Sequence, residues 1–375
     1  MKFSCEKALL QAAISTTSRA TAAKSSIPAL EGILLEAGTE LRFTGYNLET
    51  GIRTTVPAEV REGGSLVLSA RKFADVVGQL PDDTVNVTTD GLTVHIQCGA
   101  TEYNIPAIDP EEFPELPDVE SQSVLTLPRA TLSDMIGRTI FAVSQNDGRP
   151  ILTGSLFEVV GGLLTVVSVD GQRLALRREK LEKAPEADLS FVVPGAALKE
   201  VRTICGDSEE EVSILIGTRH ILFRMENTQL VTRRLEGEFL NYRQSISWKS
   251  DIKLTADVRQ LMTSISRASV ILKENSKNPL RCIVGDGELY LSSVTAADGN
   301  SYDVCPVEGS GNDLHIGFNH RFMMDALKAV PTEKAKLLMG TPSTPCIIVP
   351  VEEPEGEESF LFMVLPVRMS ASWDK

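Results

Sequence analysis

Short runs of alternating apolar and polar residues, interrupted by polar turns, occur at three places along the chain. The segment LTVVSVDGQRLALR at 164–177 alternates, breaks at Asp170-Gly171 and resumes after Arg173. An Asp-Gly pair between two alternating runs predicts a β-hairpin, because these residues accept the backbone angles of a tight turn. The segments at 41–54 and 289–304 have the same outline of strand, polar break and strand.

A short strand that runs into an amphipathic helix also occurs three times. The segments KFSCEKALLQAAISTTSRA, VLTLPRATLSDMIGRTIFAVS and IKLTADVRQLMTSISRASV follow this plan. Their strand ends at Cys5, Leu127 and Leu254 are separated by 127 − 5 = 122 and 254 − 127 = 127 residues. Regular self-similarity of this kind is the signature of an internal repeat.

A second unit, which runs strand, turn, helix, gives nearly the same period. Its matching apolar positions Phe73, Leu198 and Phe322 are separated by 198 − 73 = 125 and 322 − 198 = 124 residues. Both markers predict an α+β chain of three copies of one domain, each with two helices and two blocks of antiparallel strands. The expected domains are 1–122, 123–248 and 249–375.

The composition suits a cytoplasmic protein with ordinary cores. The 375 residues are 42% apolar, and no run approaches the roughly 20 apolar residues that a membrane helix needs. No signal peptide is visible at the start of the chain. The six cysteines are scattered without a C-x-x-C pair, which predicts reduced thiols in small core positions.

Charge is distributed unevenly. The net charge of −14 by itself argues against nucleic-acid binding, because such proteins usually carry an excess of Lys and Arg. Yet every range that we expect to be helical is net basic, and together they carry +7, which leaves −14 − 7 = −21 elsewhere. Helix propensity alone does not explain this, since Glu shares it but is scarce there. We expect one basic helical face with acidic flanks. The ranges are 6–24, 71–80, 128–143, 194–205, 255–269 and 319–330.

Catalytic motifs are missing from the sequence. It contains no G-x-S-x-G elbow, no phosphate-binding G-x-x-x-x-G-K-[ST] and no G-x-G-x-x-G, and its four histidines do not fall at metal-ligand spacing. We therefore expect no enzyme, no catalytic residue, no metal and no cofactor. Two alternatives remain open at this point: an enzyme with a carboxylate site at a domain junction, and a monomeric three-domain scaffold that binds only proteins.

Several segments, taken together and in order, resemble one family, the bacterial DNA polymerase III beta subunit or DNA sliding clamp. The chain opens with MKF, and SVDGQRLAL at 168–176 resembles a hallmark hairpin of that family. The resemblance covers essentially the whole chain. The other matching segments are FAVSQNDGRPILTG (141–154), EFLNYRQSI (238–246), IGFNHRFMMDAL (316–327) and MVLPVRM (363–369).

The resemblance implies a head-to-tail homodimer that forms a six-domain ring around duplex DNA and slides without reading sequence. Basic helices would line the hole and attract the phosphates. By resemblance, the DNA contacts are Lys24, Arg71, Asn146 and Arg149; the helix charges add Lys199 and Arg202.

The resemblance also implies a pocket between domains two and three that takes short linear motifs from the replicative polymerase, the clamp loader and repair proteins. Such a pocket is mostly apolar with a few polar groups. Arg173 and Arg368 could hold a carboxylate or carbonyl there. The matching positions are Leu152, Val169, Gly171, Gln172, Arg173, Leu174, Leu240, Asn319, Phe322, Ser343, Pro345, Met363, Val364, Leu365, Pro366 and Arg368.

The dimer contact implied by the resemblance pairs EEFPEL at 111–116 with SVILKE at 269–274. Phe113 would meet Val270 and Ile271, and the contact must close after two chains. Some positions depart from the family pattern, namely Gln172, Leu240, Gln244 and Ser245. The chain also adds SASWDK at 370–375, whose Trp373 could plug the pocket mouth.

Overall fold

The computed structural model describes residues 1–121, 123–146, 148–246, 250–273, 278–354 and 356–369. The predicted terminal plug, Trp373, lies outside the described residues. The chain folds into two compact units, each described separately below. The first comprises Met1–Ser133, Pro185–Ala187 and Ala196–Arg234, and the second comprises Asp134–Ala184, Asp188–Gly195 and Leu235–Lys375.

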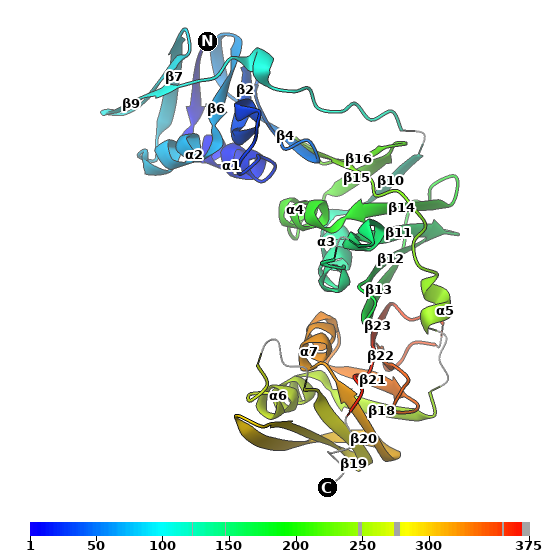
Figure 1. Cartoon of the computed structure of the whole chain (residues 1–375). Helices are drawn as coiled ribbons and strands as arrows, with labels where there is room; N and C mark the ends of the chain where they lie inside the picture. The colour runs from blue at the N-terminus through cyan, green and yellow to red at the C-terminus, as the bar shows by residue number, and fades with distance from the viewer. Residues whose placement is uncertain (122, 147, 247–249, 274–277, 355, 370–375) are drawn as a thin grey trace. The chain divides into compact units, whose positions relative to one another are not determined.

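The first unit contains two antiparallel sheets (Figure 1). One sheet has the order β5-β1-β7-β8-β9, and the other has the order β10-β15-β16-β17-β4-β3-β2-β6. The strands are β1 (Lys2–Glu6), β2 (Gly32–Ala37), β3 (Leu41–Tyr46), β4 (Thr50–Val56), β5 (Glu59–Glu62), β6 (Gly64–Ser69), β7 (Thr84–Asp90), β8 (Thr93–Cys98), β9 (Thr101–Pro106), β10 (Ser123–Pro128), β15 (Glu211–Ile216), β16 (His220–Arg224) and β17 (Thr228–Arg233).

The second unit is built on one long sheet in which strands of the central and third repeats are hydrogen-bonded to each other. Its order is β14-β11-β12-β13-β23-β22-β21-β18-β20-β19. The strands are β11 (Gly154–Val160), β12 (Leu163–Val169), β13 (Arg173–Lys180), β14 (Leu189–Pro194), β18 (Ile252–Asp257), β19 (Leu280–Thr295), β20 (Gly299–Phe318), β21 (Lys334–Met339), β22 (Cys346–Val349) and β23 (Phe360–Val364).

The helices recur two to a repeat, as the periodicity predicted. Phe73, Leu198 and Phe322 lie on α2, α4 and α7, the second helix of each repeat. The strands that contain Cys5, Leu127 and Leu254 each precede a first helix. The helices are α1 (Lys7–Ser18), α2 (Ala70–Gln79), α3 (Arg129–Gly137), α4 (Gly195–Cys205), α6 (Val258–Ala268) and α7 (His320–Ala329), with a short α5 (Tyr242–Ile246).

Two of the expected helices were predicted too long. The helix expected over 6–24 ends at Ser18, so Lys24 lies in the loop that follows it. In the last turn of α1 the Thr17 hydroxyl donates a hydrogen bond to the Ala13 carbonyl at 2.8 Å. The range 128–143 becomes α3, which ends at Gly137, and a separate 3₁₀ turn at Ile140–Ala142.

Burial follows the sequence pattern closely. On α2, Phe73 and Val77 are buried, whereas Arg71 and Lys72 are exposed. All six cysteines are buried and unpaired, which confirms their prediction as small core residues. None of the helices formed by the described residues is long and apolar enough to span a membrane.

Candidate functional site

The Asp170-Gly171 hairpin, which joins β12 to β13, is held by its own backbone and by one carboxylate. The Asp170 N–H donates to the Arg173 carbonyl at 3.3 Å. The Asp170 carboxylate accepts hydrogen bonds from the N–H groups of Gln172 at 3.0 Å and Arg173 at 3.1 Å. Gly171 has a φ of 87°, a conformation that glycine adopts without a steric penalty. The predicted hairpin is therefore confirmed, and its shape follows from the residues at the turn.

Arg173 fastens this hairpin to α7. Its Nε lies 2.8 Å from Asp170 and its Nη1 lies 2.7 Å from Asp325. The guanidinium carbon lies 4.3 Å from the centre of the Phe322 ring and 5.5 Å from that of Phe141. The side chain is only 12% exposed. Arg173 thus already binds two carboxylates of its own chain. A carboxylate of a partner would have to share the Arg173 guanidinium with both of them.

The C-terminal segment runs directly beside the hairpin. In the β13–β23 pairing, Arg173 lies opposite Val364 and Leu174 opposite Met363. The Leu365 N–H then donates to the Gln172 carbonyl at 2.9 Å. Residues from two distant parts of the sequence, both predicted to line the pocket, are therefore brought together.

An apolar cluster underlies this junction. Val169 and Leu174 are at most 2% exposed, and Met363 is 6% exposed. Leu365 packs against the same cluster but remains partly exposed. Val169, Leu174 and Met363 therefore form a buried apolar layer beneath this junction, and Leu365 is part of the apolar surface that a ligand could contact.

The remaining predicted pocket residues occupy several positions. Asn319 caps α7 by accepting a hydrogen bond from the Arg321 N–H at 3.0 Å. Pro366 forms a bridge with Phe318, the residue before that cap. Leu152 and Pro345 are buried, Gln172, Ser343 and Arg368 are exposed, and Leu240 is 42% exposed.

The connector between the second and third repeats is anchored by a contact that the sequence analysis did not identify. The Tyr242 hydroxyl donates to the Glu158 carboxylate at 2.6 Å. Arg243 also donates to that carboxylate, at 2.6 and 3.2 Å. Burial and the neighbouring Glu158 raise the pKa of Tyr242 well above its usual range. The one available signal was Glu158, a carboxylate inside the apolar strand β11.

The residues predicted to contact DNA are all exposed. Arg71 lies on the first turn of α2, and Lys199 and Arg202 lie on α4. Asn146 and Arg149 lie in the loop before β11, where the Asn146 side chain accepts a hydrogen bond from the Gly148 N–H at 2.8 Å. The structure also shows α3 to be neutral within its bounds, because Arg138 lies just beyond its end.

The three residues predicted to form the dimer contact differ in exposure. Val270 follows α6 and is 79% exposed, and Ile271 is partly exposed. Phe113, by contrast, is only 8% exposed and packs in its own unit with Leu30, Tyr46 and Val67. This burial argues against Phe113 as an anchor for a second chain.

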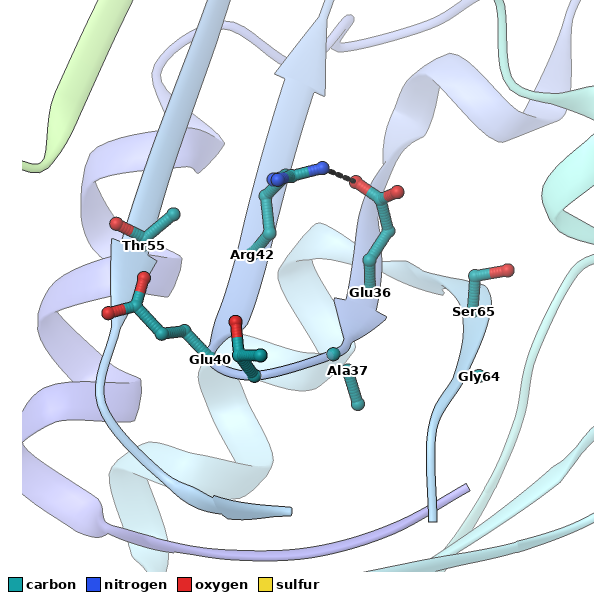
Figure 2. Close-up of a pocket in the computed structure, with 9 residues that line it drawn as sticks. Glu36, Ala37, Glu40, Arg42, Thr55, Gly64 and Ser65 are labelled. Atoms are coloured by element: carbon teal, nitrogen blue, oxygen red, sulfur yellow. Dashed lines mark ion pairs between the residues drawn. The ribbon is translucent and has the colours of Figure 1, made fainter.

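The first unit contains two hollows beside ion pairs. One, of about 400 Å³, is lined by the β2–β3 turn and its neighbours, with Arg42 and Glu36 3.8 Å apart (Figure 2). The other, of about 370 Å³, lies among α1, α4, β4 and β17, where Arg19 pairs with Glu200 at 3.1 Å. Among the described residues no group of His, Cys, Asp and Glu could hold a metal ion.

Three family models match consecutive parts of the chain. The N-terminal, central and C-terminal domains of the DNA polymerase III beta subunit match residues 1–117, 126–241 and 244–366. The chain belongs to the DNA polymerase III beta subunit family. Like other members of this family of sliding clamps, it is a non-catalytic processivity subunit, so the alternative of an enzyme is excluded.

Individual relatives agree with this assignment over their full lengths. A beta sliding clamp from Staphylococcus aureus is 30% identical over 379 residues, which cover 98% of this chain and 99% of the relative. A putative DNA polymerase III beta subunit from Eubacterium rectale has a similar structure, with a TM-score of 0.92, 33% identity and coverage of 98% and 100%. The sliding clamp from Bacillus subtilis gives a TM-score of 0.93 at 28% identity, with coverage of 99% and 100%.

Proposed function

We propose that this chain is a DNA sliding clamp that encircles duplex DNA as a head-to-tail homodimer and tethers the replicative polymerase and other partners. The observation that supports this most directly is the match of three successive beta-subunit domain models along one chain. The repeated pair of helices in each copy agrees with it. A clamp of this type needs no base-reading groups, because sliding requires contacts to the phosphates alone.

The proposed DNA contacts are exposed side chains at helices and adjoining loops. Arg71, Lys199 and Arg202 lie on helices, and Lys24, Asn146 and Arg149 lie in loops. Long cationic side chains on a solvated surface bind phosphates through weak contacts that exchange readily. Such contacts hold the duplex without fixing its position.

The proposed partner groove lies at the Asp170-Gly171 hairpin and the segment after β23. Leu365 and Pro366 offer apolar surface, and Gln172, Ser343 and Arg368 supply polar groups at its rim. Arg173 acts here by positioning the hairpin against α7, given its two ion pairs. The groove suits an extended peptide that inserts apolar side chains.

The proposed homodimer places Val270 and Ile271 of one chain against the first domain of another. Val270 is the most exposed of the large apolar side chains in the described residues. Strands β9 and β19 are sheet edges, and pairing across the interface would cover such edges. We keep the domain limits 1–122, 123–248 and 249–375, and a cytoplasmic location, as parts of this proposal.

Retention on circular DNA tests the proposal directly. The purified protein is loaded with a clamp loader onto nicked circular plasmid and passed through a sizing column. We expect it to elute with the plasmid and to dissociate when a restriction enzyme linearises the circle. Elution as free protein under both conditions, or retention on linear DNA, would contradict a topological ring.

A further inference from the structure

The turn between β3 and β4 is a copy of the hairpin at the proposed partner groove. The Asn47 N–H donates to the Thr50 carbonyl at 3.2 Å. The Asn47 side chain accepts from the N–H groups of Glu49 at 3.0 Å and Thr50 at 2.8 Å, as Asp170 does from Gln172 and Arg173. Leu48 takes the place of Gly171 and has a φ of 73°, against 87° for the glycine.

The strand register extends this equivalence to the floor of the groove. Leu174 lies opposite Val169 on β12 and opposite Met363 on β23. In the first unit, Gly51 lies opposite Tyr46 on β3 and opposite Val231 on β17. The first repeat therefore has the same strand arrangement at this place, called the first groove below, with glycine where the proposed partner groove has leucine.

The segments that leave each repeat also correspond. Ile108 exchanges two main-chain hydrogen bonds with Val67 on β6, at 2.8 and 3.0 Å. Leu235 donates to the Val192 carbonyl on β14 at 3.0 Å. Five residues beyond these anchors stand Phe113 in the first connector and Leu240 in the second, so these two residues are equivalent.

The first connector fills the first groove. A Cβ placed on Gly51 would lie 2.4 Å from Cδ2 of Leu116, 3.1 Å from Val231 and 3.2 Å from Tyr46. The Leu116 side chain therefore occupies the space that a larger side chain at position 51 would fill. Phe113 packs beside it and is 8% exposed.

The second connector behaves differently. Leu240, the counterpart of Phe113, is 42% exposed. Arg243, the counterpart of Leu116, turns to the Glu158 carboxylate on β11. These two residues therefore do not take the places of Phe113 and Leu116, although Tyr242 of the same connector is buried in the apolar cluster with Leu174 and Met363.

We propose that the first repeat contains a second peptide-binding groove, a copy of the partner groove, which residues 109–117 of the same chain occupy as an intramolecular ligand. This inference rests on the proposed function of the partner groove. The ligand is an acidic peptide, DPEEFPELP, that inserts a phenylalanine and, three residues later, a leucine. Each chain thus displays one groove to partners and keeps the other occupied by its own connector.

A free peptide of residues 109–117, labelled with fluorescein, tests this in the full-length dimer. The variant F113A/L116A empties the groove, and we expect it to bind one more peptide per chain than the unmodified protein in a stoichiometric titration. A peptide with both apolar residues replaced by Ala should not bind there. The variant E115Q, which changes an exposed residue of the same segment, should gain no site. A folded F113A/L116A protein without an added site would overturn the proposal.

Milder variants cover the case in which F113A/L116A does not fold. L116A and G51L both remove the Leu116 contact and keep Phe113. We expect each to speed hydrogen exchange of the Glu112 and Phe113 amides about tenfold, as loss of one partly buried leucine predicts. Unchanged exchange in both would overturn the proposal. Failure of the clamp function itself is separable, because it appears as loss of retention on circular DNA whatever the peptide stoichiometry.

Discussion

The main-chain N–H of Leu365 donates a 2.9 Å hydrogen bond to the carbonyl oxygen of Gln172, which binds the C-terminal segment to a hairpin of the central repeat. This bond places a partly exposed leucine beside the exposed turn residues Gly171 and Gln172. We predict that the double variant L365A/R368A loses binding of polymerase-derived peptides, since it removes apolar surface and a cation from one groove. Fluorescence anisotropy measures the peptide, and sedimentation should show an unchanged dimer. Normal peptide affinity would refute the groove assignment.

Arg173 should matter for stability as well as for binding. Replacing it with Ala leaves Asp170 and Asp325 without their shared cation and removes the contact with the Phe322 ring. We expect the free energy of unfolding to fall by about 3 kcal/mol, as for a largely buried ion pair that loses one partner. Urea denaturation measures the change. The matched variant R368A, at an exposed arginine, should leave stability within about 0.5 kcal/mol of the original value.

Charge reversal at the proposed DNA surface should impair loading. In R71E/R149E two cations become anions at exposed positions, so the phosphates are repelled. We expect retention on nicked circular DNA to drop at least tenfold while the dimer persists. R42E/R61E serves as the control, because it makes the same change in charge on strands β3 and β5. An equal loss in the control would assign the effect to net charge rather than to location.

Val270 offers a direct test of the dimer contact. Its side chain is 79% exposed, so aspartate costs the isolated chain little, but it would bury a charge in an apolar interface. We expect V270D to sediment as a monomer at micromolar concentration. V160D, at a 51% exposed valine that is the last residue of β11, should remain dimeric. A dimeric V270D would exclude this surface.

The buried thiols predict an alkaline limit of stability. Burial raises the pKa of Cys5 and Cys205 from 9.0 to about 11, and that of Cys282 to about 12. The folded chain therefore holds these protons more tightly than the unfolded chain does. Their stabilising contribution is complete below about pH 9 and is lost as pH rises from 9 towards 12. Unfolding midpoints should thus fall above pH 9, and a thiol reagent at pH 8 should label these cysteines only after denaturation.

Local sequence pattern predicted the repeated architecture well, because each repeat places its apolar residues at helical or strand spacing. The Asp170-Gly171 turn could be predicted equally well, because two adjacent residues determine its shape. The end of α1 was not, because no proline or glycine marks Ser18 as its last residue.

The site was less predictable because its contacts join residues that are distant along the chain. Arg173 gave no sign in the sequence that Asp325, on another repeat, would neutralise it. Phe113 looked like an interface residue, yet the structure packs it against Leu30 and Val67. Tyr242 lies in EFLNYRQSI, one of the segments that resemble the family. Its hydrogen bond to Glu158, however, is visible only in the structure. The place of a residue within its repeat can be predicted from the local sequence of that repeat. Whether a groove is occupied depends instead on the side chains of the connector that follows the repeat.

The glycine at position 51 shows how a triplicated protein can acquire distinct roles without new folds. Where the central repeat has a bulky residue at the matching place, the first has a vacancy deep enough to accept a side chain from its own connector. One small residue at this position of the shared backbone therefore determines which groove is occupied by the chain's own connector and which is open to partner proteins. Closing one of the two grooves in this way would limit each chain to one open binding site. Fewer partner proteins would then compete for the same molecule at one time.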